Sequence, residues 1–132
     1  MHTAPYFTAF GLLAILHALQ VVRLRIKHKI HLGSGDNPEL ERMSRVFGNY
    51  VEYVPIGLVL LIALEVAQSP VWYLHLCGMT LLLGRIFHAI GLSQTELPNS
   101  LRRLGMILTL FSLFLASVGV TLWTIFEPAS RS

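Results

Sequence analysis

The 132-residue chain contains little charge: Lys, Arg, Asp and Glu make up 13% of it, whereas hydrophobic residues make up 54%. An ordinary soluble domain has about 25% charged residues, so this composition excludes a typical water-soluble globular protein. Cys77 is the only cysteine, which makes an intramolecular disulfide impossible. Because it lies in an apolar run with no activating base one helical turn away, we expect a small buried hydrophobe rather than a nucleophile.

Positive charge is missing from much of the chain, since the N-terminal tail and the connection around Pro70 contain no lysine or arginine. The basic residues gather instead around two other connections: Arg23, Arg25, Lys27, Lys29, Arg42 and Arg45 around the first, and Arg102 and Arg103 in the third. Basic residues confined to particular loops are typical of membrane proteins, in which they set the orientation across the bilayer, and not of nucleic-acid-binding proteins. We therefore expect no nucleic-acid partner, both basic connections in the cytoplasm and both termini outside it.

Four long apolar segments account for most of the remaining sequence. Each is about as long as the hydrocarbon core of a bilayer requires, and turn-forming glycine and proline residues separate them. The sequence thus predicts an all-α integral membrane protein, a single four-transmembrane-helix domain over residues 1–132, with helices at approximately 5–29, 38–68, 70–93 and 98–126. Asp36 or Asn37 is expected to cap the second helix, with Pro38 at its first position. Gly84 and Gly91 are expected to permit close helix packing.

A polar stripe marks the second helix. At 100° per residue, five of its side chains fall within about 100° of one another: Glu41, Arg42, Arg45, Asn49 and Glu52. Charges inside a membrane are costly and survive where they face a bundle interior or a polar cavity. The stripe therefore predicts a polar site at membrane depth. An Arg–Glu pair that only holds helices together is the structural alternative.

Other polar residues are expected on the same side of the membrane. Arg23 and Arg25 end the first helix, where contact with lipid phosphate is the alternative role. Arg85 and His88 are three residues apart and share a face of the third helix. His88 has no second histidine four residues away, so no metal site is expected. Arginine forks bind carboxylates in a bidentate manner, which favours a small dianionic, peptide-like ligand, with a hydrophobic second substrate or lipid entering from the bilayer.

The same residues resemble a family signature. The second helix reads Glu41-Arg42-x-x-Arg45-x-x-x-Asn49-x-x-Glu52-Tyr53-x-Pro55. This order resembles the signature of the MAPEG family, the membrane-associated proteins in eicosanoid and glutathione metabolism. The resemblance extends to Val22-Arg23-Leu24-Arg25 and to Gly84-Arg85-x-x-His88, so it covers nearly the whole chain. The second-helix motif is specific, whereas the other two add weight only beside it.

The resemblance implies a homotrimer of four-helix bundles that binds glutathione as a co-substrate between neighbouring subunits, near the cytosolic face. The residues it places around glutathione are Arg23 or Arg25, Arg45, Asn49, Glu52, Tyr53, Arg85 and His88. In catalytic members an arginine at the start of the fourth helix stabilises the glutathione thiolate. Arg102 and Arg103 are the catalytic candidates here, and spacing does not choose between them.

One departure narrows the implied activity. Several eicosanoid-making relatives carry a tyrosine seven residues after the position of Arg85, where this chain has Leu92. We therefore expect a bacterial-type glutathione transferase of the inner membrane that serves detoxification, and whether it also has peroxidase activity stays open. A non-catalytic scaffold that binds lipid or glutathione is the main alternative. A small proton-coupled exporter using Glu52 is a further alternative, but such a carrier would not need the arginines beside that glutamate.

Overall fold

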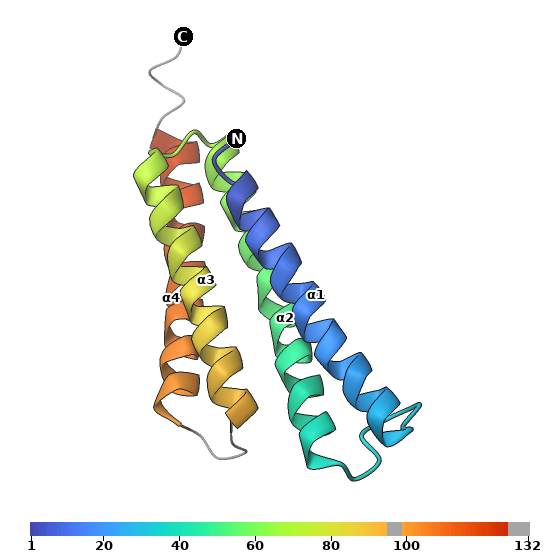
Figure 1. The fold of residues 1–132 in the computed structure, drawn as a ribbon. Coiled ribbons are helices and arrows are strands. Elements are labelled where there is room, and N and C mark those ends of the chain that lie inside the picture. The colour runs from blue at the N-terminus through green and yellow to red at the C-terminus, as the bar shows by residue number, and fades with distance from the viewer. Residues whose placement is uncertain (95–98, 127–132) are drawn as a thin grey trace.

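The computed structural model of the protein describes residues 1–94 and 99–126, and the chain runs up and down through four long helices (Figure 1). These are α1 (Ala4–His28), α2 (Pro38–Val66), α3 (Val71–Gln94) and α4 (Ser100–Phe126). All four are long and apolar enough to cross a membrane. The predicted class, an all-α membrane protein with four transmembrane helices, is confirmed.

The helix ends differ slightly from the predicted ones where the backbone turns. α1 stops at His28 because Lys29 has a φ of 55°, in the left-handed region that terminates helices. α2 stops at Val66, earlier than predicted, and Gln68 beyond it also has a φ of 55°. The predicted start of the fourth helix at residue 98 lies outside the described residues.

The start of α2 follows one of the two predicted caps. Asn37 has an extended backbone, and its side-chain oxygen accepts a hydrogen bond from the backbone N–H of Leu40 at 2.9 Å. Pro38 follows in the first turn, where its missing N–H removes no helical hydrogen bond. This cap fixes where the polar stripe of α2 begins.

α3 and α4 form the most extensive helix pair, and glycines let their backbones meet. A Cβ added at Gly84 would stand 2.8 Å from the backbone nitrogen of Thr109 and 3.0 Å from the carbonyl oxygen of Gly105. A Cβ at Gly91 would collide with the backbone nitrogen of Arg102. Both glycines therefore permit close packing, as predicted, and they fix the position of α4 against α3.

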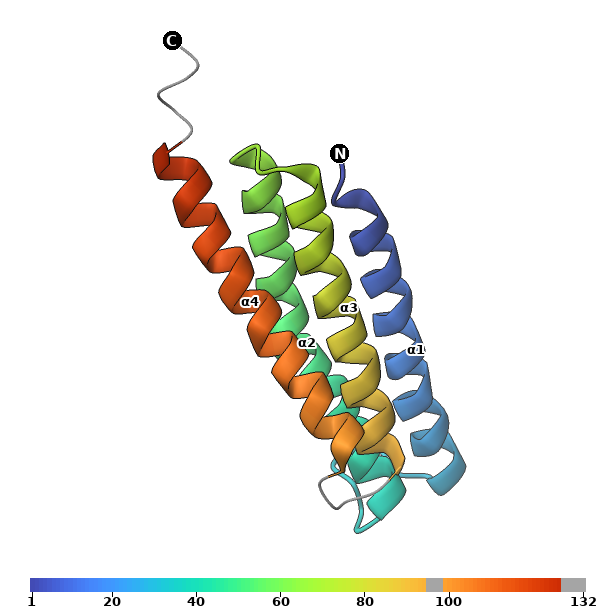
Figure 2. The same cartoon turned by 90° about the vertical axis from the view of Figure 1, so that its left-hand side faces the viewer.

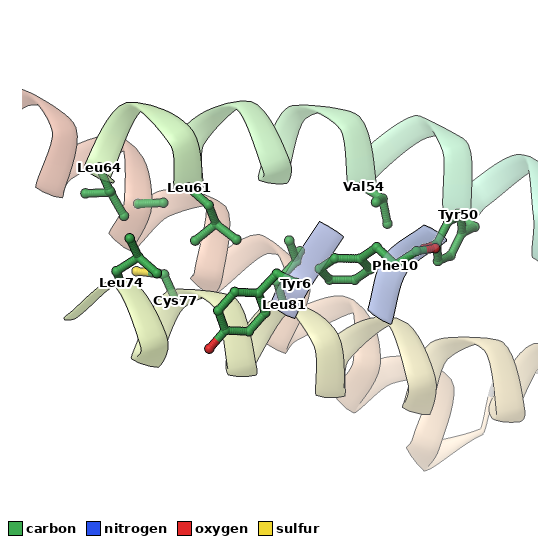
Figure 3. Packing of buried hydrophobic residues seen from close by; sticks show 10 residues of the cluster. Tyr6, Phe10, Tyr50, Val54, Leu61, Leu64, Leu74, Cys77 and Leu81 are labelled. Atoms are coloured by element: carbon green, nitrogen blue, oxygen red, sulfur yellow. The ribbon is translucent and has the colours of Figure 1, made fainter. Parts of the chain in front are cut away.

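The apolar core consists of buried side chains that pack together between the helices (Figure 3). Its buried members come from all four helices and are Tyr6, Phe10, Tyr50, Val54, Leu61, Leu64, Leu74, Cys77, Leu81 and Ala116. Cys77 is fully buried, which confirms the expected packing role of this residue. The hydroxyl of Tyr50 donates to the carbonyl of Phe10 and so ties α2 to α1.

The two ends of the bundle have different chemistry. At the end that holds the N-terminus, the Glu65 carboxylate accepts hydrogen bonds from the backbone N–H groups of His2 and Thr3, which docks the start of α1 on the end of α2. At the opposite end, α1 and α3 finish and α2 and α4 begin (Figures 1 and 2). Most of the arginines lie toward that second end.

Candidate functional site

A cavity of about 750 Å³ lies at the arginine-rich end of the bundle. Side chains of all four helices and of the connection between α1 and α2 line it: Arg25, Gly33, Ser34, Pro38, Glu41, Arg42, Ser44, Arg45, Gly48, Asn49, Glu52, His88, Leu92 and Arg102. Four of these residues are arginines and two are glutamates, so the lining is net positive. The volume falls within the range of about 300–1,000 Å³ that small-molecule sites occupy.

The ten residues predicted for the site fall into three groups. Six line the cavity, namely Arg25, Arg45, Asn49, Glu52, His88 and Arg102. Tyr53 and Arg85 lie beside Asn49 and do not line the cavity. Arg23 and Arg103 are exposed and also stand outside the described cavity lining.

α2 supplies most of the wall because its polar residues repeat with the helical period. Asn49 is half-buried, whereas Arg45 and Glu52 are exposed in the single chain although they lie about two and about four turns into the helix. From α1, the Arg25 guanidinium donates to the carbonyl of Gly33 at 3.0 Å. This bond folds the α1–α2 connection back toward the start of the wall.

Arg85 of α3 is the most unusual residue near the cavity, because it is only 2% exposed. Its Nη2 donates to Oδ1 of Asn49 at 2.8 Å, and its Nη1 donates to the hydroxyl of Thr109 at 3.5 Å. Its guanidinium carbon lies 5.4 Å from the ring centroid of Tyr53, within cation–π range. Nε has no partner among the described residues. Arg85 therefore joins α2, α3 and α4 behind the cavity wall.

His88 lies one turn beyond Arg85 and does line the cavity. It is 2% exposed, and its Nδ1 is buried with no hydrogen-bond partner in the described part of the chain. The backbone of His88 is so close to Gly105 that a Cβ there would collide with it. A buried polar atom without a partner is costly, so a ligand or water in the cavity is its natural partner.

The start of α4 distinguishes the two catalytic candidates. Asn99 caps this helix: its Oδ1 accepts from the backbone N–H of Arg102 at 2.8 Å, and its Nδ2 donates to the carbonyl of Gly91 at 2.8 Å. The cap ties the first turn of α4 to the end of α3. In this position the half-buried Arg102 lines the cavity, whereas the exposed Arg103 does not.

The cavity also includes residues that the site prediction missed. Arg42 lies on the polar stripe, but at the mouth of the helix an ion pair with Glu39 or Glu41 is a plausible structural role for it, so the site prediction did not include it. Ser44 lies about 60° outside the stripe at 100° per residue, so periodicity alone gave no reason to include it. Asn99 is not part of the cavity lining, but it positions Arg102 by capping α4, and the site prediction did not include it. Its role depends on the approach of α3 and α4, which no local pattern encodes.

Comparison with known proteins gives a consistent picture. The model of the MAPEG family matches residues 3–122 of the chain. The chain is 38% identical over 91 residues to the inner membrane protein YecN of Escherichia coli K12, an alignment that covers 69% of this chain and 70% of that protein. YecN of Escherichia coli O6:H1 matches equally well, also at 38% over 91 residues.

Proposed function

Because the chain belongs to the MAPEG family, we propose that this multi-pass membrane protein is a glutathione transferase that stabilises the glutathione thiolate for attack on a hydrophobic electrophile. The observation that carries the proposal is the net-positive cavity, in which Arg25, Arg42, Arg45 and Arg102 converge from three helices. Glutathione has two carboxylates, and arginine forks bind carboxylates better than a lysine point charge does.

The donor set fits the rest of a small peptide as well. Glu52 supplies an acceptor for an amino group, and Asn49 supplies an amide for peptide hydrogen bonds. Leu92 gives the cavity an apolar wall next to His88. A hydrophobic electrophile would enter from the bilayer, because all four helices that contribute to the cavity lining are apolar enough to span a membrane.

Arg102 is the residue that we assign to thiolate stabilisation. A free thiol has a pKa near 8.5, so it is mostly protonated at neutral pH. Lowering that pKa by about two units requires roughly 2.7 kcal/mol of differential stabilisation. A guanidinium in a partly dehydrated cavity can supply this. The thiol proton leaves to solvent. The thiolate sulfur then forms a bond to the electrophilic carbon while the bond from that carbon to its leaving group breaks, and the leaving group departs as an anion with the electron pair.

The test is the ultraviolet thiolate absorbance of glutathione mixed with detergent-purified protein near neutral pH. We expect a thiolate signal in the wild type, loss of that signal in Arg102→Ala, and retention in the matched variant Arg103→Ala, whose arginine stands outside the cavity lining. Retention of the full signal in Arg102→Ala would assign the thiolate to another residue. Glutathione binding with no thiolate in the wild type would exclude the transferase.

That last outcome is the one expected of a second candidate, a scaffold that binds glutathione or lipid without catalysis. One observation favours it: the buried Leu92 lines the cavity where several relatives carry a tyrosine hydroxyl. Leucine can neither donate to a thiolate nor orient a substrate oxygen. The thiolate measurement therefore separates the two functions directly.

We also propose that the protein works as a homotrimer in a bacterial inner membrane, with the cavity near the cytoplasmic face. Arg45 and Glu52 are exposed in the single chain although they lie well inside α2, and a neighbouring subunit would cover them. The mass of the protein in detergent, corrected for bound detergent, should equal three chains. A protein that is monomeric and still binds glutathione would contradict the subunit-interface site.

A further inference from the structure

Arg85 poses a problem that the proposed function does not address. Its guanidinium is almost fully buried, yet no described carboxylate lies within ion-pair distance of it. A buried charge without a counter-charge is expensive, so its hydrogen-bond partners must matter. Those partners are a side-chain amide and a hydroxyl, both neutral: Asn49 on α2 and Thr109 on α4.

We propose that Arg85 and Thr109 are positioning residues that fix the amide of Asn49 as a hydrogen-bond donor to the cavity, so that this position selects a ligand with an anionic or carbonyl acceptor. The inference rests on the proposed function for the identity of the ligand. The hydrogen bond between Arg85 and Asn49, which we call the tether, is independent of the proposed function because it follows from the geometry alone.

The orientation of the Asn49 side-chain amide follows from its hydrogen bond to Arg85. A guanidinium can only donate, so the Asn49 atom that it contacts at 2.8 Å must be the oxygen. That bond orients Oδ1 toward Arg85, and we therefore assign Nδ2, which carries both N–H donors, to the cavity that Asn49 lines. Without Arg85 the amide could flip by 180° and present its oxygen instead. Arg85 thus decides whether this part of the wall donates or accepts.

Thr109 fixes Arg85 in turn. Its hydroxyl donates to the carbonyl of Gly105 at 2.8 Å, so it can only accept from the Arg85 Nη1 on its other side. Thr109 is fully buried, and its backbone lies against Gly84 at one of the close approaches of α3 and α4. The guanidinium is therefore held between α4 and Asn49, with the ring of Tyr53 beside it.

The first experiment tests the tether without glutathione. Asn49→Asp keeps the shape of the side chain and gives Arg85 a carboxylate, which forms a stronger, charge-assisted hydrogen bond. We expect Asn49→Asp to unfold in detergent several degrees above Asn49→Ala. In an Arg85→Met background this advantage should disappear, because the introduced carboxylate then has no guanidinium to bind. The four proteins together form a double-mutant cycle. An equal advantage in both backgrounds would overturn the tether.

The second experiment measures glutathione affinity by calorimetry. Asn49→Asp replaces the donor by a charged acceptor, so we expect glutathione to bind about tenfold or more weakly although the fold is retained. Thr109→Val removes the hydroxyl and should weaken glutathione binding by about three- to tenfold. Thr109→Ser keeps the hydroxyl and should bind glutathione as the wild type does. Ser112→Ala is the matched control, because Ser112 is also buried on α4 and donates to α3, at the carbonyl of Cys77, away from Arg85.

The outcomes separate this inference from the proposed function. Wild-type affinity in Asn49→Asp would overturn the donor role, and equal loss in Thr109→Val and Ser112→Ala would overturn the positioning role of Thr109. If the stability cycle behaves as expected but the wild type binds no glutathione, the tether stands and the proposed function fails. Loss of affinity in Asn49→Asp together with the stability result supports both.

Discussion

At the residue scale, the cavity relies on arginine forks rather than on charge alone. Arg25 shows why, because its guanidinium is shared between the cavity it lines and the carbonyl of Gly33. A single ammonium cannot present several fixed donors in this way. The same reasoning applies to Arg45, which projects from the middle of the polar stripe of α2 into the cavity.

We therefore expect Arg45→Lys to weaken glutathione binding by about tenfold, because lysine keeps the charge but loses the bidentate geometry. The measurement is calorimetric titration of the detergent-solubilised protein. Arg23→Lys is the matched control, since Arg23 is an exposed arginine outside the described cavity lining and its replacement should leave affinity unchanged. Equal effects of the two substitutions would mean that the cavity recognises net charge only.

At the element scale, the position of α4 depends on the glycines at its contact with α3. Gly84→Ala would drive a methyl group against the backbone nitrogen of Thr109, which cannot move without shifting the helix. We expect a loss of about 1–3 kcal/mol in unfolding free energy, typical of overpacking, and weaker glutathione binding because the tether through Thr109 shifts. Thermal unfolding in detergent and calorimetric titration measure the two effects.

The control for this substitution is another helical glycine with space around it. A Cβ at Gly11 of α1 meets nothing within 4 Å, so Gly11→Ala should be neutral or should stabilise the helix by up to about 1 kcal/mol. If Gly11→Ala and Gly84→Ala destabilise the protein equally, the α3–α4 contact is not what makes Gly84 necessary.

The helices and the polar wall of α2 were predictable because each depends on a local period. The apolar runs specify four spans, and 100° spacing alone brings Arg45, Asn49 and Glu52 to one face. The choice of Arg102 over Arg103 was not predictable, because it depends on how α4 is rotated against α3. The burial of Arg85 was also not predictable, because a sequence does not show whether the side chain of an arginine near a helix end extends to water or into the interior.

At the scale of the whole molecule, the distribution of charge predicts how the bundle sits in the membrane. All the lysines and arginines of the described residues lie in the half of the bundle where α1 and α3 end. Among the described residues, the end that holds the N-terminus has none, and the Glu65 carboxylate there accepts hydrogen bonds from backbone N–H groups. Positively charged segments are retained in the cytoplasm during insertion, so the cavity should open on that side.

Cysteine labelling in intact cells tests this orientation. Leu32 in the α1–α2 connection is 91% exposed and Val66 at the far end of α2 is 77% exposed, so a cysteine at either position is accessible in the isolated chain. We expect a membrane-impermeant maleimide to label Val66→Cys in intact spheroplasts, and Leu32→Cys only after the membrane is permeabilised. The wild type should stay unlabelled because its Cys77 is buried. The reverse pattern would place the arginine cavity on the outer face, where a cytoplasmic pool of glutathione could not reach it.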